Sequence, residues 1–486
     1  MKVNTSPLKE DKRKISIIEQ KLARTKEKNR ALSQEAKYLR RRVKELQASR
    51  DNWKAKNKDK RLMVKHLNKQ LKAKETVKRH HYSKSLILLC IQLRVYACCS
   101  YRSISRILLV LKMCAILEKK RLPCANTIEN WVTKMGCYWL EGQDQSRADF
   151  PIGIMIDELF GQGNERIIAI MGVPFIKDNS QALAYEDVQL LYLGGQSSWT
   201  SQNLEQLIGQ LIKDQHLDIR VVMSDEDAKL LKTARLLDLP HLPDINHALA
   251  TCLRKTFEKN NHYKAFIKQI ASFQSRSVNQ PLSYLRPPKQ RVKARFMNQK
   301  ACVHWALELL HRWSSLDQTE QHFFASLQSH RPILKVLKQC LDIAEWIAKL
   351  FKTQGLKNST LIQAQQYMEY PHCTDQLKQT FIKHVQNYLD QYRTFVKKHK
   401  ATFHVSTDIL ESLFGKYKQI QPTNPLTGIS RISLELPLYC LNQQQIEANL
   451  KIALEATFMT HLNSWISRHA TENQASKRRE FFKKRK

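Results

Sequence analysis

Ile152-Gly153-Ile154-Met155-Ile156-Asp157 and Ile219-Arg220-Val221-Val222-Met223-Ser224-Asp225 are two short apolar runs that each lead into an aspartate. Runs of this length, rich in β-branched residues, predict buried strands. We predict that further strands cover 166–173, 188–193 and a short segment near Leu242, and that 203–213 forms a helix. Three strands, a helix, a strand, a helix and a strand make a mixed α/β pattern.

The two aspartates occupy positions at which open α/β sheets form sites. A carboxylate at the C-terminal end of a strand projects from the sheet edge, and two adjacent strands would bring Asp157 and Asp225 together. A pair of carboxylates suits Mg²⁺, which takes its remaining ligands from water and phosphate. Glu411 is a third candidate, on a helix predicted over 406–418 with Ser406 or Thr407 as its cap. Each acid alone is more often an ordinary surface residue, but three in this order favour a site.

The composition points to a polyanionic partner. The 486 residues carry 81 Lys and Arg against 44 Asp and Glu, a formal net charge of +37. Scattered lysine and arginine neutralise phosphates and release counterions. The N-terminus does not resemble a secretory signal, and no apolar run is long enough to span a membrane. The 11 cysteines form no C-x-x-C pair, which argues against structural zinc and for reduced thiols in an intracellular compartment.

Residues 12–75 form a heptad array without a stutter or a proline, which predicts a coiled coil. The a positions are Ile15, Leu22, Asn29, Ala36, Val43, Arg50, Asn57, Val64 and Leu71, and the d positions are Ile18, Thr25, Leu32, Leu39, Leu46, Trp53, Lys60 and Leu67. Asn29 and Asn57 favour a parallel dimer, because an asparagine that faces itself fixes register. Residues 1–80 hold 27 basic and 9 acidic side chains, so contact with DNA is a second role. A single solvated basic helix is the alternative.

Residues 84–140 predict a small helical domain. An apolar helix over 85–99 is followed by a helix that begins after Ser100, and a third helix over 125–136 is expected to end at Gly136. The third helix has the form of a helix-turn-helix recognition helix, with Asn126, Thr127, Asn130 and Lys134 facing DNA. A linker bundle without a DNA-binding role is the alternative.

From about 250 to 405 the chain is predicted to be helical, with one basic interruption. Between Leu282 and Lys300 six basic residues occur without an acid, next to a proline pair that disfavours helix. We expect Arg291, Lys293 and Arg295 to contact the phosphate backbone; a solubilising loop is the alternative. If the bound DNA has a base flipped out of its stack, that base would need an aromatic side chain to stack on. The candidates are Trp305, Trp313 and Trp346, although core packing is the commoner role for each.

Three motifs resemble those of DDE transposases, in particular the bacterial insertion-sequence type with a hAT-like arrangement. Asp244-Ile245-Asn246-His247 is similar to the Cys/Asp-x-x-His motif that follows the second catalytic aspartate. Glu411-x-x-Phe414-Gly415-Lys416-Tyr417-Lys418 resembles the segment of the catalytic glutamate, and Arg295-Phe296-Met297-Asn298 looks like a motif of the same group. The resemblance covers roughly residues 84–460. It implies an RNase H-like α/β core interrupted by an all-α insertion, and the heptad array is not part of the family pattern.

The resemblance also implies roles for single residues. Asp157, Asp225 and Glu411 would coordinate two Mg²⁺ or Mn²⁺ ions, and His247 would position the scissile phosphate. Lys416 and Lys418 would contact DNA, with a solvated helix end as the alternative. The rivals for the catalytic positions are Asp227, Glu158 and Asp408. The implied partners are double-stranded DNA, as transposon ends and target, and a second copy of the chain in a homodimer or higher oligomer.

We therefore expect five segments that form four parts. They are a basic coiled coil over 1–80, a helical DNA-binding domain over 81–148, the RNase H-like core in two segments over 149–255 and 403–486, and the helical insertion over 256–402. The expected function is cleavage at the ends of a transposable element and joining of 3′-hydroxyl ends to target DNA. The alternatives are a non-catalytic DNA-binding architectural protein and a structure-specific nuclease. Such a protein would work in the cytoplasm at the bacterial nucleoid, or in the nucleus of a eukaryote, without a membrane partner.

Overall fold

The structure is a computed structural model that describes residues 6–71, 77–117, 121–141, 151–160, 165–175, 182–278, 281–290, 296, 299–369, 375–399, 402–420, 428–470 and 474–483. The chain divides into two compact units. The first is Met1–Glu75 with Leu108–Arg121, and the second is Thr76–Ile107 with Leu122–Lys486. The second unit contains all the strands that the structure describes.

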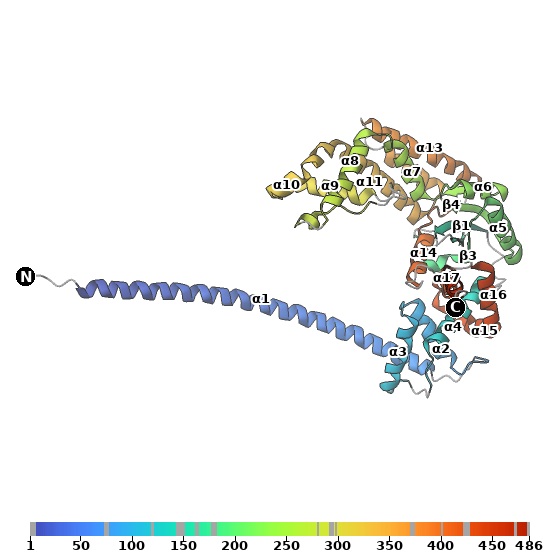
Figure 1. Cartoon of the computed structure of the whole chain (residues 1–486), viewed down its shortest axis with the longest axis horizontal. Coiled ribbons are helices and arrows are strands. Elements are labelled where there is room, and N and C mark those ends of the chain that lie inside the picture. Colours follow the sequence, from blue (N-terminus) through green and yellow to red (C-terminus); the bar gives the residue numbers. More distant parts are fainter. Residues whose placement is uncertain are drawn as a thin grey trace, which may run out of the picture. The chain divides into compact units, whose positions relative to one another are not determined.

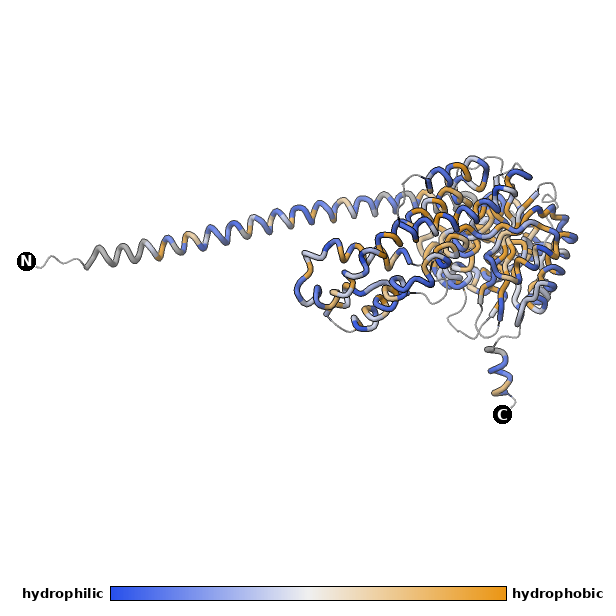
Figure 2. The backbone as a smooth tube through the Cα atoms, turned by 90° about the horizontal axis from the view of Figure 1, so that it is seen from above, coloured by the Kyte–Doolittle hydropathy of each residue, from blue (hydrophilic) through white to orange (hydrophobic). Residues whose placement is uncertain are grey.

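The first unit is dominated by one helix, α1 (Ser6–Leu71), of 66 residues (Figure 1). Its one proline, Pro7, stands in the first turn, where a missing N–H costs no intrahelical hydrogen bond. Apolar residues recur along it among hydrophilic ones, as Figure 2 shows. The predicted long helix is confirmed, whereas its pairing with a second helix stays a prediction.

Three helices follow α1. α2 (Lys84–Val95) begins after Ser83, whose hydroxyl accepts a hydrogen bond from the N–H of Leu86. α3 (Tyr101–Met113) begins after Ser100, the cap expected from the sequence, which accepts from the N–H of Ser103 at 3.1 Å. The last part of α3 belongs to the first unit, and the rest lies in the second.

α4 (Ala125–Glu141) runs five residues beyond its predicted end at Gly136. Gly136 does not end the helix; it permits close packing. A Cβ atom built there would lie 1.4 Å from the carbonyl oxygen of Leu434, in the 3₁₀ segment η7 (Arg431–Cys440). α4 is largely buried, because η7, α2 and the later helices α15 (Gln443–Ala456) and α16 (Met459–His469) all pack against it.

The five strands form one mixed sheet in the order β3-β2-β1-β4-β5. The strands are β1 (Pro151–Phe160), β2 (Arg166–Pro174), β3 (Gln189–Gln196), β4 (Asp218–Ser224) and β5 (His241–Pro243). β2 pairs antiparallel with both β1 and β3, whereas β4 pairs parallel with both β1 and β5. The predicted strands are therefore present, and α5 (Ser201–Gln215) is the predicted helix between the third and fourth.

The two faces of the sheet have different neighbours. Ile154 and Ile156 of β1 and Val222 of β4 lie in one core with α5 and α6 (Ala228–Leu236). Because side chains alternate along a strand, Met155 and Asp157 point to the opposite face. On that side β1 contacts α14 (Asp408–Ile420).

β1 does not end at Asp157 as the sequence predicted. It continues to Phe160 because its antiparallel partner β2 pairs with it over that whole length, with Asp157 opposite Ala169. The ladder with β4 is shorter and has Met155 opposite Met223 as its last pair. Relative to β4, Asp157 still lies beyond the end of the ladder.

Between β5 and α14 the described residues are helical apart from connections. The α-helices are α7 (Ile245–Phe257), α8 (Asn261–Arg276), α9 (Gln299–His311), α10 (Gln318–Phe324), α11 (Arg331–Gln354), α12 (Asn358–Glu369) and α13 (Gln376–His399). α11 and α13 pack against α7 and against each other. Leu356 and Phe403 form one isolated antiparallel bridge.

The chain is thus a mostly helical α/β protein with one five-stranded mixed sheet, and its N-terminal part is a long helix. A buried ion pair joins α2 to η7: Arg94 donates to both carboxylate oxygens of Glu435, which also accepts from the Tyr101 hydroxyl at 2.6 Å. Among the described helices, none has the length and apolar character needed to cross a membrane.

Candidate active site

Three carboxylates and a histidine from four separate segments meet on the α14 side of the sheet. Asp157 lies on β1 and Asp225 directly follows β4. Each stands two residues beyond the paired residues Met155 and Met223, and the charge of Asp225 acts on the Asp157 carboxyl group, so the two aspartates are neighbours. Glu411 lies in the first turn of α14, and His247 lies near the start of α7. The sequence-predicted catalytic set is therefore brought together.

The surroundings of Asp157 strongly disfavour its negative charge. Burial raises the pKa of Asp157 to about 7, although the N–H of Glu158 donates a hydrogen bond to its Oδ1 at 2.7 Å. The charges of Asp225 and Glu411 act in the same direction as burial, and the charge of His247 acts against it. A cation that binds beside such a carboxyl group stabilises its ionised form.

Hydrogen bonds with neighbouring residues fix the position of Asp225. Burial raises its pKa, while the N–H of Asp227 donates to its Oδ1 at 3.3 Å. The Ser224 hydroxyl donates to the carbonyl oxygen of Asp225 and lies 2.8 Å from Nε2 of His241. Burial lowers the pKa of His241 to about 4, so this ring is neutral at physiological pH. These contacts fix the turn on which Asp225 sits.

The rival acids have other partners. Asp227 is the N-cap of α6 and accepts from the N–H of Lys229 at 2.8 Å. Glu158 forms ion pairs with Arg166, at 3.1 Å, and with Lys229. Each of these carboxylates therefore has a structural role that accounts for its position.

His247 is the cation of the cluster. Its Nε2 lies 3.8 Å from Oε1 of Glu411. The interaction with the Glu411 carboxylate, assisted by the charges of Asp244 and Asp225, outweighs burial and raises the pKa of His247 to about 9. At neutral pH the ring is therefore an imidazolium that can donate a hydrogen bond to an anion.

Asp244 joins three of the segments that carry the cluster. It is 1% exposed and is the N-cap of α7, where Oδ1 accepts from the N–H of His247 at 2.8 Å. Its Oδ2 accepts from both the N–H and the hydroxyl of Thr407, at 2.7 and 3.1 Å, just before α14. Its own N–H donates to the carbonyl of Ser224 at 2.8 Å. Through its side chain and its backbone N–H, Asp244 thus sets α7, α14 and the end of β4 relative to one another.

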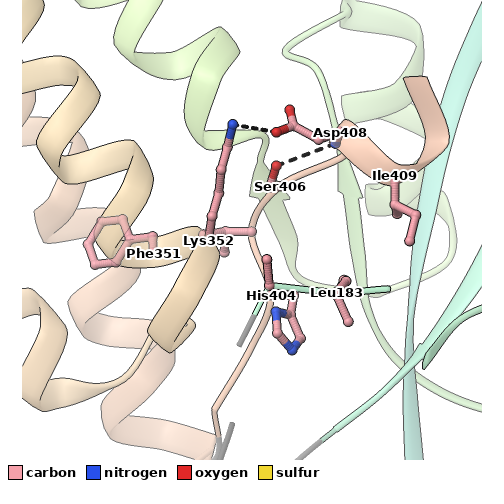
Figure 3. A pocket seen from close by; sticks show the side chains of 9 residues that line it. Leu183, Phe351, Lys352, His404, Ser406, Asp408 and Ile409 are labelled. Carbon is pink, nitrogen blue, oxygen red and sulfur yellow. Dashed lines mark hydrogen bonds and ion pairs between the residues drawn. The ribbon is translucent and has the colours of Figure 1, made fainter. Parts of the chain in front are cut away.

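The helical segment contacts the site from two sides. From α13, the hydroxyls of Tyr388 and Tyr392 reach the carbonyl oxygen of Pro243, beside Asp244, at 3.1 and 2.5 Å. From α11, Lys352 pairs with Asp408, the first residue of α14 (Figure 3). Asp408, the third rival, also accepts from the side-chain amide of Asn246.

A pocket lies beside the start of α14. Figure 3 shows Phe351, Lys352 and Leu183 around it, together with His404 and Ile409. The three carboxylates of the cluster do not line it. The pocket is therefore separate from the carboxylate cluster.

Two other predicted site residues lie on α14, nearer its C-terminal end than Glu411. Lys416 is half-buried over the ring of Tyr439, with its Nζ 4.9 Å from the ring centroid, whereas Lys418 is exposed. Their contact with DNA stays a prediction.

The predicted recognition helix offers little free surface. On α4, Asn126 is exposed, Thr127, Asn130 and Lys134 are half-buried, and the helix is otherwise a core element. Only its first turn has the exposure that a base contact needs.

The indole rings of Trp305 and Trp346 are packed rather than free, whereas Trp313 is half-buried in the short 3₁₀ segment η5 (Trp313–Ser315). Trp305 donates from its indole N–H to the carbonyl of Leu285 at 3.0 Å and packs beside Phe273 and Phe324. Trp346 stacks on Tyr367 with a centroid separation of 3.9 Å. Arg291, Lys293 and Arg295 lie outside the described residues.

The donor set fits Mg²⁺ in kind, because hard carboxylate oxygens are the ligands this ion prefers. Asp157 and Asp225 could hold one ion between them, with Glu411 near. Within the described residues, however, no group of three or more His, Cys, Asp or Glu is arranged so that it could hold a metal ion. Two carboxylates still suffice where water and phosphate complete the coordination.

Several positioning residues escaped the sequence analysis. Tyr388, Tyr392 and His241 belong to no recognisable motif, and the tyrosines contact a carbonyl about 145 residues earlier in the chain.

No family model matches this chain, and neither does any of the curated proteins with which it was compared.

Proposed function

We propose that this protein is a DDE-type transposase, which cleaves DNA at the ends of a mobile element and joins the 3′-hydroxyl ends to target DNA. The observation that carries the proposal is the meeting of Asp157, Asp225 and Glu411 on one face of the sheet. The charges of Asp225 and Glu411 both act on the carboxyl group of Asp157.

The topology supports this assignment. Three antiparallel strands continued by two parallel ones, in the order β3-β2-β1-β4-β5, is the arrangement expected of an RNase H-like core. The helices from α8 to α13 would then be the all-α insertion, placed between the second and third catalytic acids.

Each residue of the cluster has a role that follows from its surroundings. Asp157, Asp225 and Glu411 would hold the divalent ions. When bound, two such ions activate the attacking oxygen and stabilise the leaving oxygen of a phosphodiester. His247, charged at neutral pH, would donate to a non-bridging oxygen of the scissile phosphate and orient it.

The net charge of +37 supports a nucleic acid as the substrate, because phosphate contacts supply most of the sequence-independent affinity. The absence of a three-donor group among the described residues favours the second candidate, a non-catalytic DNA-binding protein derived from a transposase. Joining of ends distinguishes a transposase from a nuclease of the same fold.

The experiment uses labelled duplexes taken from the DNA that borders the gene on either side. Cleavage and joining are followed in Mg²⁺, in Mn²⁺ and in EDTA, with the wild type and Asp225→Asn. Asp227→Asn is the matched control, two residues away, because asparagine caps a helix about as well as aspartate does.

We expect the wild type and Asp227→Asn to give cleaved and joined products in Mg²⁺ and in Mn²⁺, and to give none in EDTA. Asp225→Asn should bind the duplex with wild-type affinity and leave it intact, since affinity comes mainly from lysine and arginine. Cleavage without joining would identify a nuclease, and binding without cleavage in either metal would identify the architectural protein. An active Asp225→Asn protein would contradict the assignment of the site.

A further inference from the structure

We infer that α1 is a dimerisation helix, and that two copies of the chain pair through it in parallel and in register. The inference is independent of the proposed catalytic activity. It rests on the exposed apolar side chains of α1, on their spacing, and on the polar residues that interrupt them.

The large apolar side chains of α1 whose exposure the structure describes are at least half exposed, and most fall on one stripe. Those on a or d positions of the heptad are Ile18, Leu22, Leu32, Leu39, Val43, Leu46 and Trp53, and those outside it are Ile17, Tyr38, Leu62 and Met63. A stripe that recurs every 3.5 residues is complementary to a second stripe with the same spacing. A second copy of α1 supplies that stripe.

The stripe has a continuous centre. Leu32, Ala36, Leu39, Val43 and Leu46 occupy five successive a and d positions without a polar residue. Glu35 at g and Arg40 at the following e position would form an ion pair between the two helices on each side of this centre. Lys56 at g and Arg61 at e would repel one another, so the pairing should be strongest between residues 32 and 46.

Asn29 and Asn57 decide the orientation. In a parallel, in-register pair each asparagine faces its own copy, where the two amides can hydrogen-bond to each other. An antiparallel pair centred on the apolar stretch would place Asn29 opposite Leu46, and the amide would be buried without a partner. Arg50 would face its copy as well, but its long side chain can extend to water at the edge of the seam.

The first test is a cross-link in the full chain. Asn29→Cys should form a disulfide-linked dimer on mild oxidation, because the two a positions face each other in this arrangement. Gln34→Cys, on the outward f position of the same helix, should give no more linked dimer than the wild type. An antiparallel pair, or an α1 that lies along DNA without pairing, would give no link at position 29 and would overturn the inference.

The second test is the oligomeric state, measured by light scattering without DNA. Leu39→Gln with Leu46→Gln should raise the dissociation constant of the dimer about a thousandfold or more, because the seam loses four leucines per dimer. Tyr38→Gln with Glu45→Gln, on the neighbouring outward positions, should leave it within about threefold. A wild type that is monomeric at about 10 μM, a trimer, or a seam variant that dimerises normally would contradict the inference.

Discussion

Replacing Asp157 by asparagine should stabilise the metal-free protein while removing its response to Mg²⁺. An ordinary aspartate titrates near 3.8, but in the folded chain the pKa of Asp157 is about 7. At about 1.4 kcal/mol for each tenfold change in proton affinity, the ionised carboxylate costs the folded protein up to about 4 kcal/mol. The asparagine carbonyl can still accept from the N–H of Glu158. We therefore expect Asp157→Asn to be about 2–4 kcal/mol more stable than the wild type at pH 8 in EDTA.

The sign of the pH dependence follows from the raised pKa. The folded state keeps the proton of Asp157 up to pH of about 7, whereas the unfolded chain releases it near 3.8. The stability that this group provides is therefore complete below about pH 4 and is lost as the pH rises to about 7. The advantage of the asparagine variant should grow over the same interval. The variant and the wild type should be compared at the same pH, because the contribution of His247 is lost as the pH rises from about 6.5 to its pKa of about 9.

The assay is urea unfolding followed by circular dichroism, in EDTA and in 10-fold steps of Mg²⁺. Mg²⁺ should stabilise the wild type by mass action and should have no such effect on Asp157→Asn. Asp214→Asn, an exposed carboxylate on α5, is the control and should change neither the stability nor the response to Mg²⁺. Equal stability of the variant and the wild type at pH 8, with Mg²⁺ stabilising both, would refute the reasoning about the site.

Three further predictions concern the parts that position the site. Asp244→Asn should cost about 2–3 kcal/mol and should also lower the cleavage rate, since one oxygen that accepts two hydrogen bonds becomes a donor; unfolding and cleavage assays measure both. Gly136→Ala should destabilise the protein by more than about 3 kcal/mol because its Cβ would meet a carbonyl of η7, whereas Gly209→Ala in α5, with open space around it, should be neutral or stabilise by up to about 1 kcal/mol. Arg94→Met should cost about 3–5 kcal/mol by leaving Glu435 buried without its partner, and replacing both residues by apolar ones should recover much of that loss in a double-mutant cycle.

The strands and the meeting of Asp157 with Asp225 could be predicted because both depend on local apolar runs. A buried strand is recognisable from a few consecutive residues, and the carboxyl ends of two neighbouring parallel strands necessarily lie together. The extension of β1 to Phe160 was not predictable in this way. It depends on the length of the antiparallel partner β2, which the run itself does not contain.

The predicted end of α4 at Gly136 was wrong for a related reason. A glycine near the end of an apolar pattern commonly terminates a helix. Gly136 instead leaves room for the backbone of Leu434, which is about 300 residues away in sequence. The clamp made by Asp244 and the contacts of Tyr388 and Tyr392 likewise join segments about 145–165 residues apart. Pairings over such distances leave no periodicity or spacing in a single sequence. The assignment of Glu411 rested on a resemblance of motifs, and its place near Asp157 agrees with that resemblance.

The most direct measurement of the central claim is the metal dependence of cleavage by Asp225→Cys. Mg²⁺ strongly prefers oxygen ligands, whereas a thiolate binds Mn²⁺ better, so replacing a metal ligand by cysteine changes which ion supports the reaction. If Asp225 holds a catalytic ion, the variant should be inactive in Mg²⁺ and should regain cleavage of the bordering duplex in Mn²⁺, while Asp225→Asn stays inactive in both. Full activity of Asp225→Cys in Mg²⁺ would contradict the claim that this carboxylate is a metal ligand.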